Sequence, residues 1–158
     1  MLFRSGAQSS TLAHQSEQVF AAAMMPVLHP ATVQEYLDFG LYGFALSRLS
    51  GCWVGFKAVT ETVESSASVE VGAQHLPLTL PEDGPAQDLS IRWPDSPLAQ
   101  ERRLHGPRMQ AVAAFARAHP IDRVVFAPTA GRLGIVATGK AYLDVRQALA
   151  QLGIDGSG

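Results

Sequence analysis

Short apolar runs alternate along the first half of the chain with stretches that favour helices. Residues 13–25 are mostly small and unbranched and favour a helix, since such side chains lose little rotamer freedom there. Residues 26–30 form a short extended piece between two prolines. Residues 52–59 are apolar on both alternating faces except at Lys57, which is typical of a parallel strand covered by helices. This half therefore predicts an α/β arrangement.

The clearest helix signal covers residues 32–49. Thr32 and Glu35 have the spacing of a capping box, in which each side chain satisfies an exposed N–H at the helix start. Gly40 and Gly43 weaken the helix intrinsically, so we interpret them as points of close packing against a sheet, and Gly51 ends the helix. One apolar stripe recurs at helical spacing, at Val33, Leu37, Leu41, Phe44 and Leu49.

A second unit follows a proline-rich stretch. Residues 60–66 are polar and predict a loop, and residues 67–72 alternate as a short strand would. Five prolines between Gln74 and Pro97 mark a linker. After this linker the sequence predicts a helix that begins at Pro97 and is broken or kinked at Gly106-Pro107. Two strands over 122–127 and 132–138 and a final amphipathic helix from Lys140 are predicted to follow. The apolar face of that last helix carries Tyr142, Val145, Leu149 and Leu152, with Gly153 at its C′ position.

Composition narrows the classes of function. The chain has 158 residues, 47% hydrophobic and 16% charged, as in globular proteins, and its net charge of −2 provides no basic surface for nucleic acid or an anionic membrane. Its longest apolar stretches are too short and interrupted to span a bilayer, so we expect no membrane association. The one cysteine, Cys52, lies in an apolar run and is expected to be buried and reduced, which favours the cytoplasm.

Residues 134–141 spell Gly, four residues, Gly-Lys and then Ala, close to a nucleotide-binding P-loop. The β-branched Ile135 and Val136 continue a strand where a phosphate cradle needs loop residues, and Ala141 lacks the hydroxyl that would hold Mg²⁺. We therefore interpret the stretch as a strand, a tight turn and a helix start. No zinc site is expected from the scattered His14, His29, His75, His105 and His119, and Glu61 and Glu64 are expected to be solvated.

Several blocks together resemble one known family. They are SSTLAHQSEQVF, PVLHPATVQEYLDFGLYGFALSRLSGCWVGFKAVTETVESSASVEV, ERRLH and RLGIVATGKAYLDVRQALAQLGI, in the family's order from about Ser9 to Asp155. They resemble the long, fused indolepyruvate ferredoxin oxidoreductases of the 2-oxoacid:ferredoxin oxidoreductase superfamily. The resemblance implies that residues 9–72 are the C-terminal half of a thiamine-diphosphate pyrimidine-binding domain, a parallel sheet with flanking helices. It also implies a linker over 73–96 and the start of a transketolase-C-terminal-like α/β domain over 97–158, whereas residues 1–8 are expected to be non-native or disordered.

The resemblance also implies a chemistry for the parent enzyme, oxidative decarboxylation of an aryl 2-oxoacid such as indolepyruvate. Thiamine diphosphate with Mg²⁺ and 4Fe–4S clusters are the implied cofactors, coenzyme A is the co-substrate, and ferredoxin takes the electrons. A single cysteine cannot hold a cluster by four thiolates, and the family's ring-activating Glu and diphosphate-binding domain fall outside the chain. We therefore expect a cytoplasmic fragment that binds none of these alone, whose partners are the remainder of a homo-oligomeric parent polypeptide and ferredoxin.

Candidate contacts to cofactor or substrate lie in two loops. The resemblance places the 9–15 segment near the thiamine site, and the residues after the strand over 52–59 lie at the end of a parallel strand, where ligands bind. The alternative for the first loop is ordinary helix capping, and the alternative for the second is ordinary turn formation. The candidates are Ser9, Ser10, His14 and Gln15 in the first loop and Thr60, Thr62, Ser65 and Ser66 in the second. For the chain as a whole, the alternative is a free-standing noncatalytic α/β module that binds a small ligand or a partner.

Overall fold

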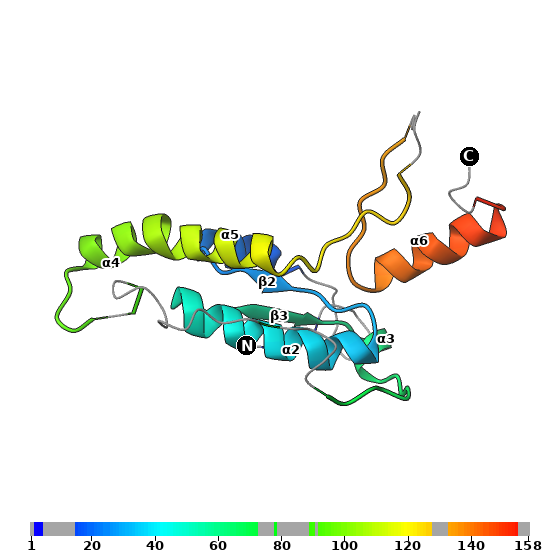
Figure 1. Ribbon diagram of the computed structural model, residues 1–158, viewed down its shortest axis with the longest axis horizontal. Coiled ribbons are helices and arrows are strands. Elements are labelled where there is room, and N and C mark those ends of the chain that lie inside the picture. The colour runs from blue at the N-terminus through cyan, green and yellow to red at the C-terminus, as the bar shows by residue number, and fades with distance from the viewer. Residues whose placement is uncertain are drawn as a thin grey trace.

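The computed structural model describes residues 2–4, 15–72, 78, 89–90, 92–127 and 133–154 (Figure 1). The first part contains β1 (Leu2–Arg4), α1 (Glu17–Ala22), β2 (Val27–Leu28), α2 (Val33–Ser50), β3 (Gly55–Ala58) and α3 (Thr60–Val63). The second contains α4 (Pro97–Arg103), one π-helical turn η1 (Leu104–Arg108), α5 (Met109–Ala118) and α6 (Lys140–Gln151). Among the described helices, none has the length and apolar character that crossing a membrane requires.

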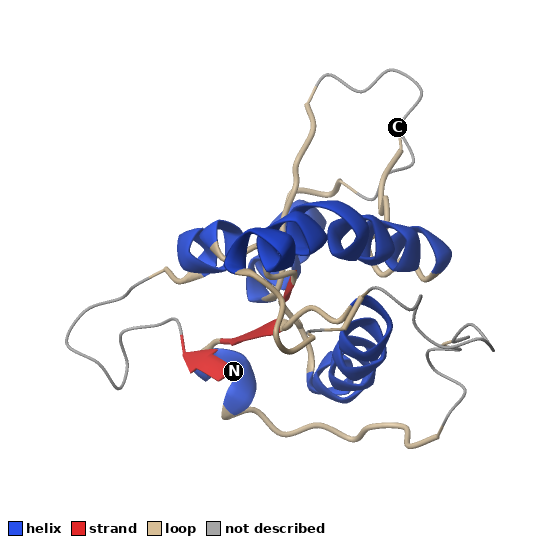
Figure 2. Cartoon of the chain, turned by 90° about the vertical axis from the view of Figure 1, so that its left-hand side faces the viewer, coloured by secondary structure: helices blue, strands red, loops and turns tan. Residues whose placement is uncertain are grey.

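A small parallel sheet lies between helices, which confirms the predicted α/β class. The strand order is β1-β3-β2, and Val27 and Leu28 pair with Gly55 and Phe56. The strands are short arrows among helices and long loops (Figure 2). The predicted strand over 52–59 is therefore confirmed over Gly55–Ala58, at the centre of the sheet.

The two faces of the sheet are covered by different helices. A Cβ on Gly43 of α2 would lie 3.2 Å from Leu28 of β2, so α2 packs closely on one face. A Cβ on Gly55 of β3 would lie 3.3 Å from the ring of Phe20 in α1. Since successive strand residues point to opposite faces, α1 covers the face opposite to α2.

Helix α2 begins and ends where the sequence predicts. Thr32 is its N-cap and accepts a hydrogen bond from the Glu35 N–H at 3.2 Å. The Glu35 carboxylate accepts from the N–H of Ala31 at 2.6 Å, so its half of the capping box reaches one residue further back than predicted. Gly51 ends the helix with φ of 69°, a conformation that favours glycine.

The apolar stripe predicted for α2 is buried only in part: Leu49 packs against the core and Val33 is half-buried, whereas its three central members are exposed. The core consists of Leu28, Tyr42, Ala45, Leu46 and Phe115, and the rings of Tyr42 and Phe115 meet edge to face at 5.0 Å. By contrast, Leu41 and Phe44 are 61% and 71% exposed, and Leu37 is exposed too. Gly40 lies on this outer side and has no neighbour within 4 Å of a Cβ, so the close packing predicted for it is wrong.

Of the two predicted effects of Gly106-Pro107, a break or a kink, the break does not occur, and the proline lies in a π-helical turn. Ser96 caps α4 by accepting from the Ala99 N–H at 3.3 Å, with Pro97 in the first turn as predicted. At Pro107, which lacks an N–H, the helix widens into η1 and continues as α5. The buried Arg108 of this turn donates from Nε to the carbonyl oxygen of Leu89 at 2.6 Å, beside Gly51 at the electronegative end of α2.

Two segments near the sheet differ from the prediction. The helix predicted over 13–25 is described only over Glu17–Ala22, and Met24 after it has φ of 53°. The polar stretch predicted as a loop forms the short helix α3. A four-residue helix at the end of a strand leaves no periodic signal in the sequence, which explains this error.

The strand predicted over 67–72 does not form. The side-chain amide of Gln34 occupies both backbone groups of Glu70, donating to its carbonyl oxygen at 3.2 Å and accepting from its N–H at 2.8 Å. One amide side chain thus replaces the hydrogen bonds that a neighbouring strand would make.

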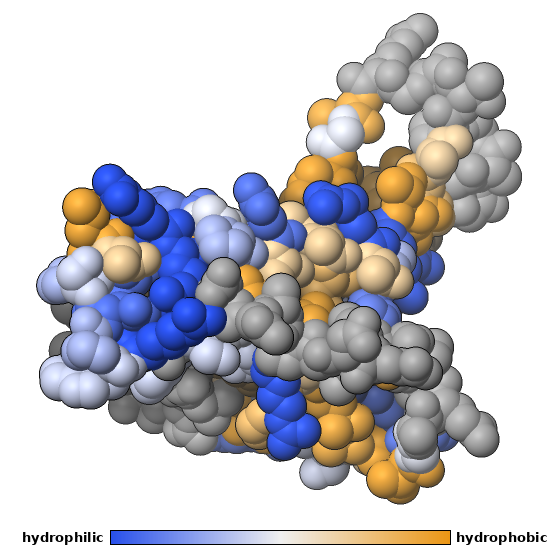
Figure 3. Space-filling model, turned by 60° about the vertical axis from the view of Figure 1, so that its left-hand side comes forward, coloured by the Kyte–Doolittle hydropathy of each residue, from blue (hydrophilic) through white to orange (hydrophobic). Residues whose placement is uncertain are grey.

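The strands predicted over 122–127 and 132–138 are also absent from the described parts of these stretches. Val124, Leu133 and Val136 are exposed, Val136 completely. In Figure 3, apolar atoms in orange lie at the upper right, where they border the residues drawn in grey. A strand needs a neighbour for its backbone hydrogen bonds, and the described residues provide none here.

Candidate functional site

The carboxyl edge of the sheet gathers charged and polar side chains on its α1 face. His29 follows β2, Lys57 belongs to β3, and the pairing of Leu28 with Phe56 makes them neighbours in register. Leu28 faces α2, so alternation directs His29 and Lys57 to the opposite face, where Glu17 of α1 lies. Open parallel sheets bind their ligands at this edge. We call Glu17, His29 and Lys57 the edge cluster.

An ion pair joins two members of the edge cluster. The Lys57 ammonium contacts Oε1 of Glu17 across the face of the sheet. This hydrogen bond is the main reason that the pKa of Glu17 lies below its usual range. The second carboxylate oxygen of Glu17 is buried and has no hydrogen-bond partner in the described structure. Glu17 therefore keeps an acceptor that a further donor could use.

His29 is held in its neutral form. Burial, followed by the nearby charge of Lys57, lowers the pKa of His29, and the charge of Glu17 opposes this. Its Nδ1 lies 3.3 Å from the hydroxyl of Thr138, and its Nε2 is buried without a partner among the described residues. A neutral imidazole can donate a hydrogen bond to an oxyanion from one ring nitrogen and accept a proton at the other.

The stretch that resembles a P-loop covers this histidine. Gly139, the N-cap of α6, has φ of 59°, and a Cβ on it would lie only 2.3 Å from Nε2 of His29. Lys140 contacts both carboxylate oxygens of Asp144, one turn along α6, at 2.7 and 2.9 Å. The glycine thus permits close packing and the lysine pairs within its own helix, in agreement with the interpretation as a turn and helix start.

The predicted site residues are only partly brought to this edge. Ser9, Ser10 and His14 lie outside the described residues, and Gln15 is exposed and bonded to Gln18. Ser65 and Ser66 are exposed, and Ser65 donates to the carbonyl of Thr62. These residues stay predictions as cofactor or substrate contacts.

Two predicted threonines are buried in α3. Thr62 donates to the Val59 carbonyl at 3.1 Å and lies 2.8 Å from the Tyr36 hydroxyl, so its own hydrogen bonds are complete. Thr60 is 2% exposed, and its hydroxyl has no partner among the described residues. Thr60 is therefore a predicted contact residue whose hydroxyl can still form a hydrogen bond with a ligand.

Sequence reasoning did not select the edge cluster. Lys57 was visible as the one charge in an apolar strand, a signal that a strand residue reaches for a buried partner. His29 and Glu17 lie 12 residues apart in the sequence on different elements, so no spacing rule connects them before the sheet is known.

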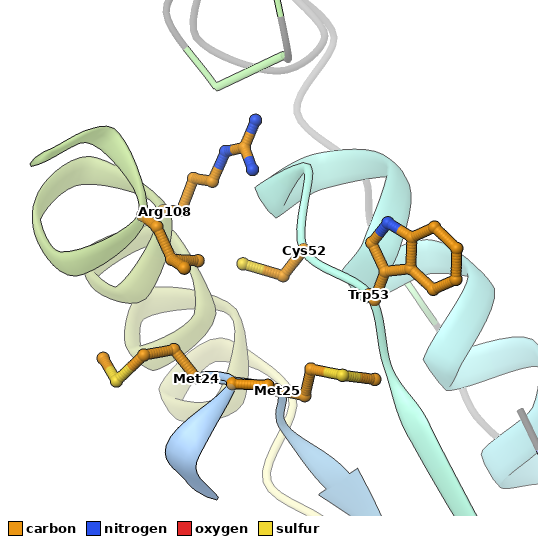
Figure 4. Close-up of a pocket in the computed structure, with 7 residues that line it drawn as sticks. Met24, Met25, Cys52, Trp53 and Arg108 are labelled. Atoms are coloured by element: carbon orange, nitrogen blue, oxygen red, sulfur yellow. The ribbon is translucent and has the colours of Figure 1, made fainter. Parts of the chain in front are cut away.

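A hollow lies at the opposite, amino edge of the sheet (Figure 4). Its volume of about 170 Å³ is below that of ordinary ligand sites. Cys52 in its wall is buried, as predicted, and this burial raises the pKa of the thiol, which disfavours the reactive thiolate. The lining residues are Ala23, Met24, Met25, Cys52, Trp53, Leu104 and Arg108. We therefore regard the carboxyl edge as the candidate site.

Comparisons with known proteins agree with the sequence motifs. Residues 123–158 match the family model of the indolepyruvate oxidoreductase domain. Over 84% of its length the chain is similar to indolepyruvate oxidoreductase subunit IorA of Pyrococcus abyssi and of Pyrococcus horikoshii, at 30% identity in each case. IorA of Methanothermobacter thermautotrophicus is 29% identical over 136 residues. The chain is a relative of the indolepyruvate oxidoreductases. This confirms the predicted resemblance to indolepyruvate oxidoreductases, and the long fused form stays a prediction.

The chain spans 21% of the length of these IorA relatives. No solved structure matches it significantly. The similarity therefore concerns a part of these longer relatives, and the part matched by the family model includes α6.

Proposed function

We propose that this chain is a fragment of a thiamine-diphosphate-dependent indolepyruvate ferredoxin oxidoreductase of the long fused form. The parent would oxidatively decarboxylate an aryl 2-oxoacid to the acyl-coenzyme A and pass the electrons to ferredoxin. Similarity to IorA over 84% of the chain supports the family. The observation that carries the assignment of a site is the edge cluster, placed where parallel sheets bind ligands.

The described residues do not fit the cofactors themselves. A carboxylate that activates the thiamine ring by sharing its proton needs a raised pKa, whereas the pKa of Glu17 is lowered by Lys57. Within the described ranges no three His, Cys, Asp or Glu side chains gather as metal ligands, and the sequence has one cysteine. Thiamine diphosphate, Mg²⁺ and the 4Fe–4S clusters would thus be held elsewhere in the parent polypeptide.

In this proposal the chain contributes scaffold and an edge that faces the reaction. Lys57 would hold Glu17 ionised, and the neutral His29 would supply a hydrogen bond at the same edge. The domains remain as the sequence predicts, a half pyrimidine-binding domain over 9–72, a linker over 73–96 and the start of a transketolase-C-terminal-like domain from 97. The parent is proposed to be cytoplasmic and homo-oligomeric.

Two preparations test this function. The isolated chain should bind no thiamine diphosphate in calorimetry and should not reduce a viologen dye with indolepyruvate and coenzyme A. A longer polypeptide in which the chain keeps its natural neighbours should reduce the dye, and Lys57→Met should slow it. The matched control is Lys140→Met, which removes an exposed ion pair on α6. Turnover by the isolated chain, or equal effects of the two substitutions, would contradict the proposal. Specific binding of another ligand at the edge cluster of the isolated chain, lost in Lys57→Met, would favour the alternative, a noncatalytic binding module.

A further inference from the structure

Two arginines converge on one phenol at the far end of the molecule from the amino-edge hollow. Nη1 of Arg146 lies 3.1 Å from the hydroxyl oxygen of Tyr142, and Nη2 of Arg123 lies 3.5 Å from the same oxygen. Both guanidinium groups also lie near the face of the Tyr142 ring, 5.8 and 5.9 Å from its centre. Arg146 and Tyr142 belong to α6, whereas Arg123 belongs to the segment after α5.

The two positive charges are not neutralised within the described residues. Neither arginine forms a salt bridge there, and Asp144, which lies between Tyr142 and Arg146 on α6, uses both oxygens on Lys140. Hydrogen bonds from Arg146 and then Arg123 lower the pKa of Tyr142. Like charges that share a site repel each other, so an anion between them would be stabilised.

A hollow opens beside these cations. Its volume is about 350 Å³, within the range of small-molecule sites. The Arg146 guanidinium lies 5.4 Å from the centre of the Phe126 ring, which covers one side of the hollow. The lining residues are Phe126, Arg146, Ala150, Gly153 and Ile154. An apolar floor with a cationic rim suits a ligand that joins an anionic group to an apolar or aromatic body.

We propose that this surface binds a phosphate monoester, with Arg123 and Arg146 on the phosphate and the ester's body in the hollow. Two guanidinium groups match the double negative charge of a phosphate monoester, whereas a carboxylate is satisfied by one arginine in a bidentate pair. Tyr142 accepts from both arginines, which leaves its own O–H free to donate to the same phosphate. This site is separate from the edge cluster and from the function proposed above.

Calorimetry on the full chain tests the site with AMP as the probe. AMP should bind more tightly than inorganic phosphate, adenosine should not bind, and indole-3-acetate, an aryl carboxylate, should bind more weakly than AMP. Arg123→Gln and Arg146→Gln should each weaken AMP binding by about tenfold, because each removes a hydrogen bond to a charged group. Tyr142→Phe should weaken it less.

The control is Arg117→Gln, an exposed arginine of α5, which should leave AMP affinity unchanged. Far-ultraviolet circular dichroism verifies that each variant keeps its helices. Three results would overturn the proposal: no AMP binding, the same affinity in the Arg123 and Arg146 variants as in the control, or tighter binding of indole-3-acetate than of AMP. Equal affinity for inorganic phosphate and AMP would show that the hollow does not hold the ester's body.

Discussion

Gly139 lies so close to His29 that a Cβ on the glycine would stand 2.3 Å from Nε2 of the imidazole. The start of α6 is thereby packed against the carboxyl edge of the sheet. Thr138, just before this helix, contacts His29 although the two are 109 residues apart in the sequence. Backbone conformation and space both require glycine at this position, since its φ is 59°.

Gly139→Ala should therefore destabilise the chain by more than backbone strain alone. With φ of 59° and ψ of −143°, Gly139 has a conformation that essentially only glycine adopts. Such a conformation costs another residue about 1–3 kcal/mol, and the clash with His29 adds to this. Gly153→Ala is the matched control, because Gly153 has φ of 71° but no neighbour within 4 Å of a Cβ. Urea unfolding measures both free energies. Equal losses in the two variants would show that the His29 contact is not part of the folded state in solution.

Acid should weaken the fold in two steps. The pKa of His29 in the folded chain lies below its ordinary value of 6.5. As the pH falls below 6.5, the unfolded chain therefore binds a proton before the folded chain does, and the free energy of unfolding decreases. The pKa of Glu17 is also lowered, so its contribution is lost at more acidic pH, below its ordinary value of 4.5. Urea unfolding at a series of pH values should show that the loss of stability just below pH 6.5 disappears in His29→Asn. Retention of the first loss in that variant would assign it to another group.

The outer side of α2 should bind an apolar dye without contributing to stability. Leu41→Glu and Phe44→Glu should reduce the fluorescence of 1-anilinonaphthalene-8-sulfonate and leave the free energy of unfolding nearly unchanged, since both side chains are exposed. Leu46→Ala in the core should instead lower that free energy by about 2–5 kcal/mol. A large loss of stability from Leu41→Glu would mean that this side is buried in solution.

The contact between Gln34 and Glu70 should be visible in hydrogen exchange. The Glu70 amide donates to the Gln34 side chain at 2.8 Å, so Gln34→Ala should speed the exchange of this amide. Gln18→Ala is the control, because Gln18 is exposed and its side-chain amide donates to the exposed Gln15. Unchanged protection at Glu70 would imply that another group holds this segment.

The sequence predicts elements whose signals are local and fails where a distant partner decides. The Thr32 cap, the Gly51 end of α2 and the parallel strand at Gly55–Ala58 follow from local patterns and are observed. Gly40 and Gly43 have the same local signal, yet only Gly43 meets the sheet, because helix rotation is set by packing on Leu28. Val124 and Val136 have strand propensity but no neighbouring strand in the described structure.

The edge cluster could not be predicted for a related reason. Its members come from a helix, a strand end and a strand centre, and only the register of β2 on β3 makes His29 a neighbour of Lys57. The isolated charge of Lys57 in an apolar strand is the usable signal in the sequence, and it does not indicate which carboxylate pairs with it.

The π-helical turn η1 changes the phase of the long helix that contains it. Arg108, the last residue of the turn, is buried, and Val112, Phe115 and His119 follow it at helical spacing. Phe115 is part of the core and Val112 packs against it. Before the turn, α4 has no buried residue. The turn thus acts as a local insertion that resets which residues face α2. When this helix is compared with its relatives, a gap of one residue near Pro107 is expected wherever the proline is replaced.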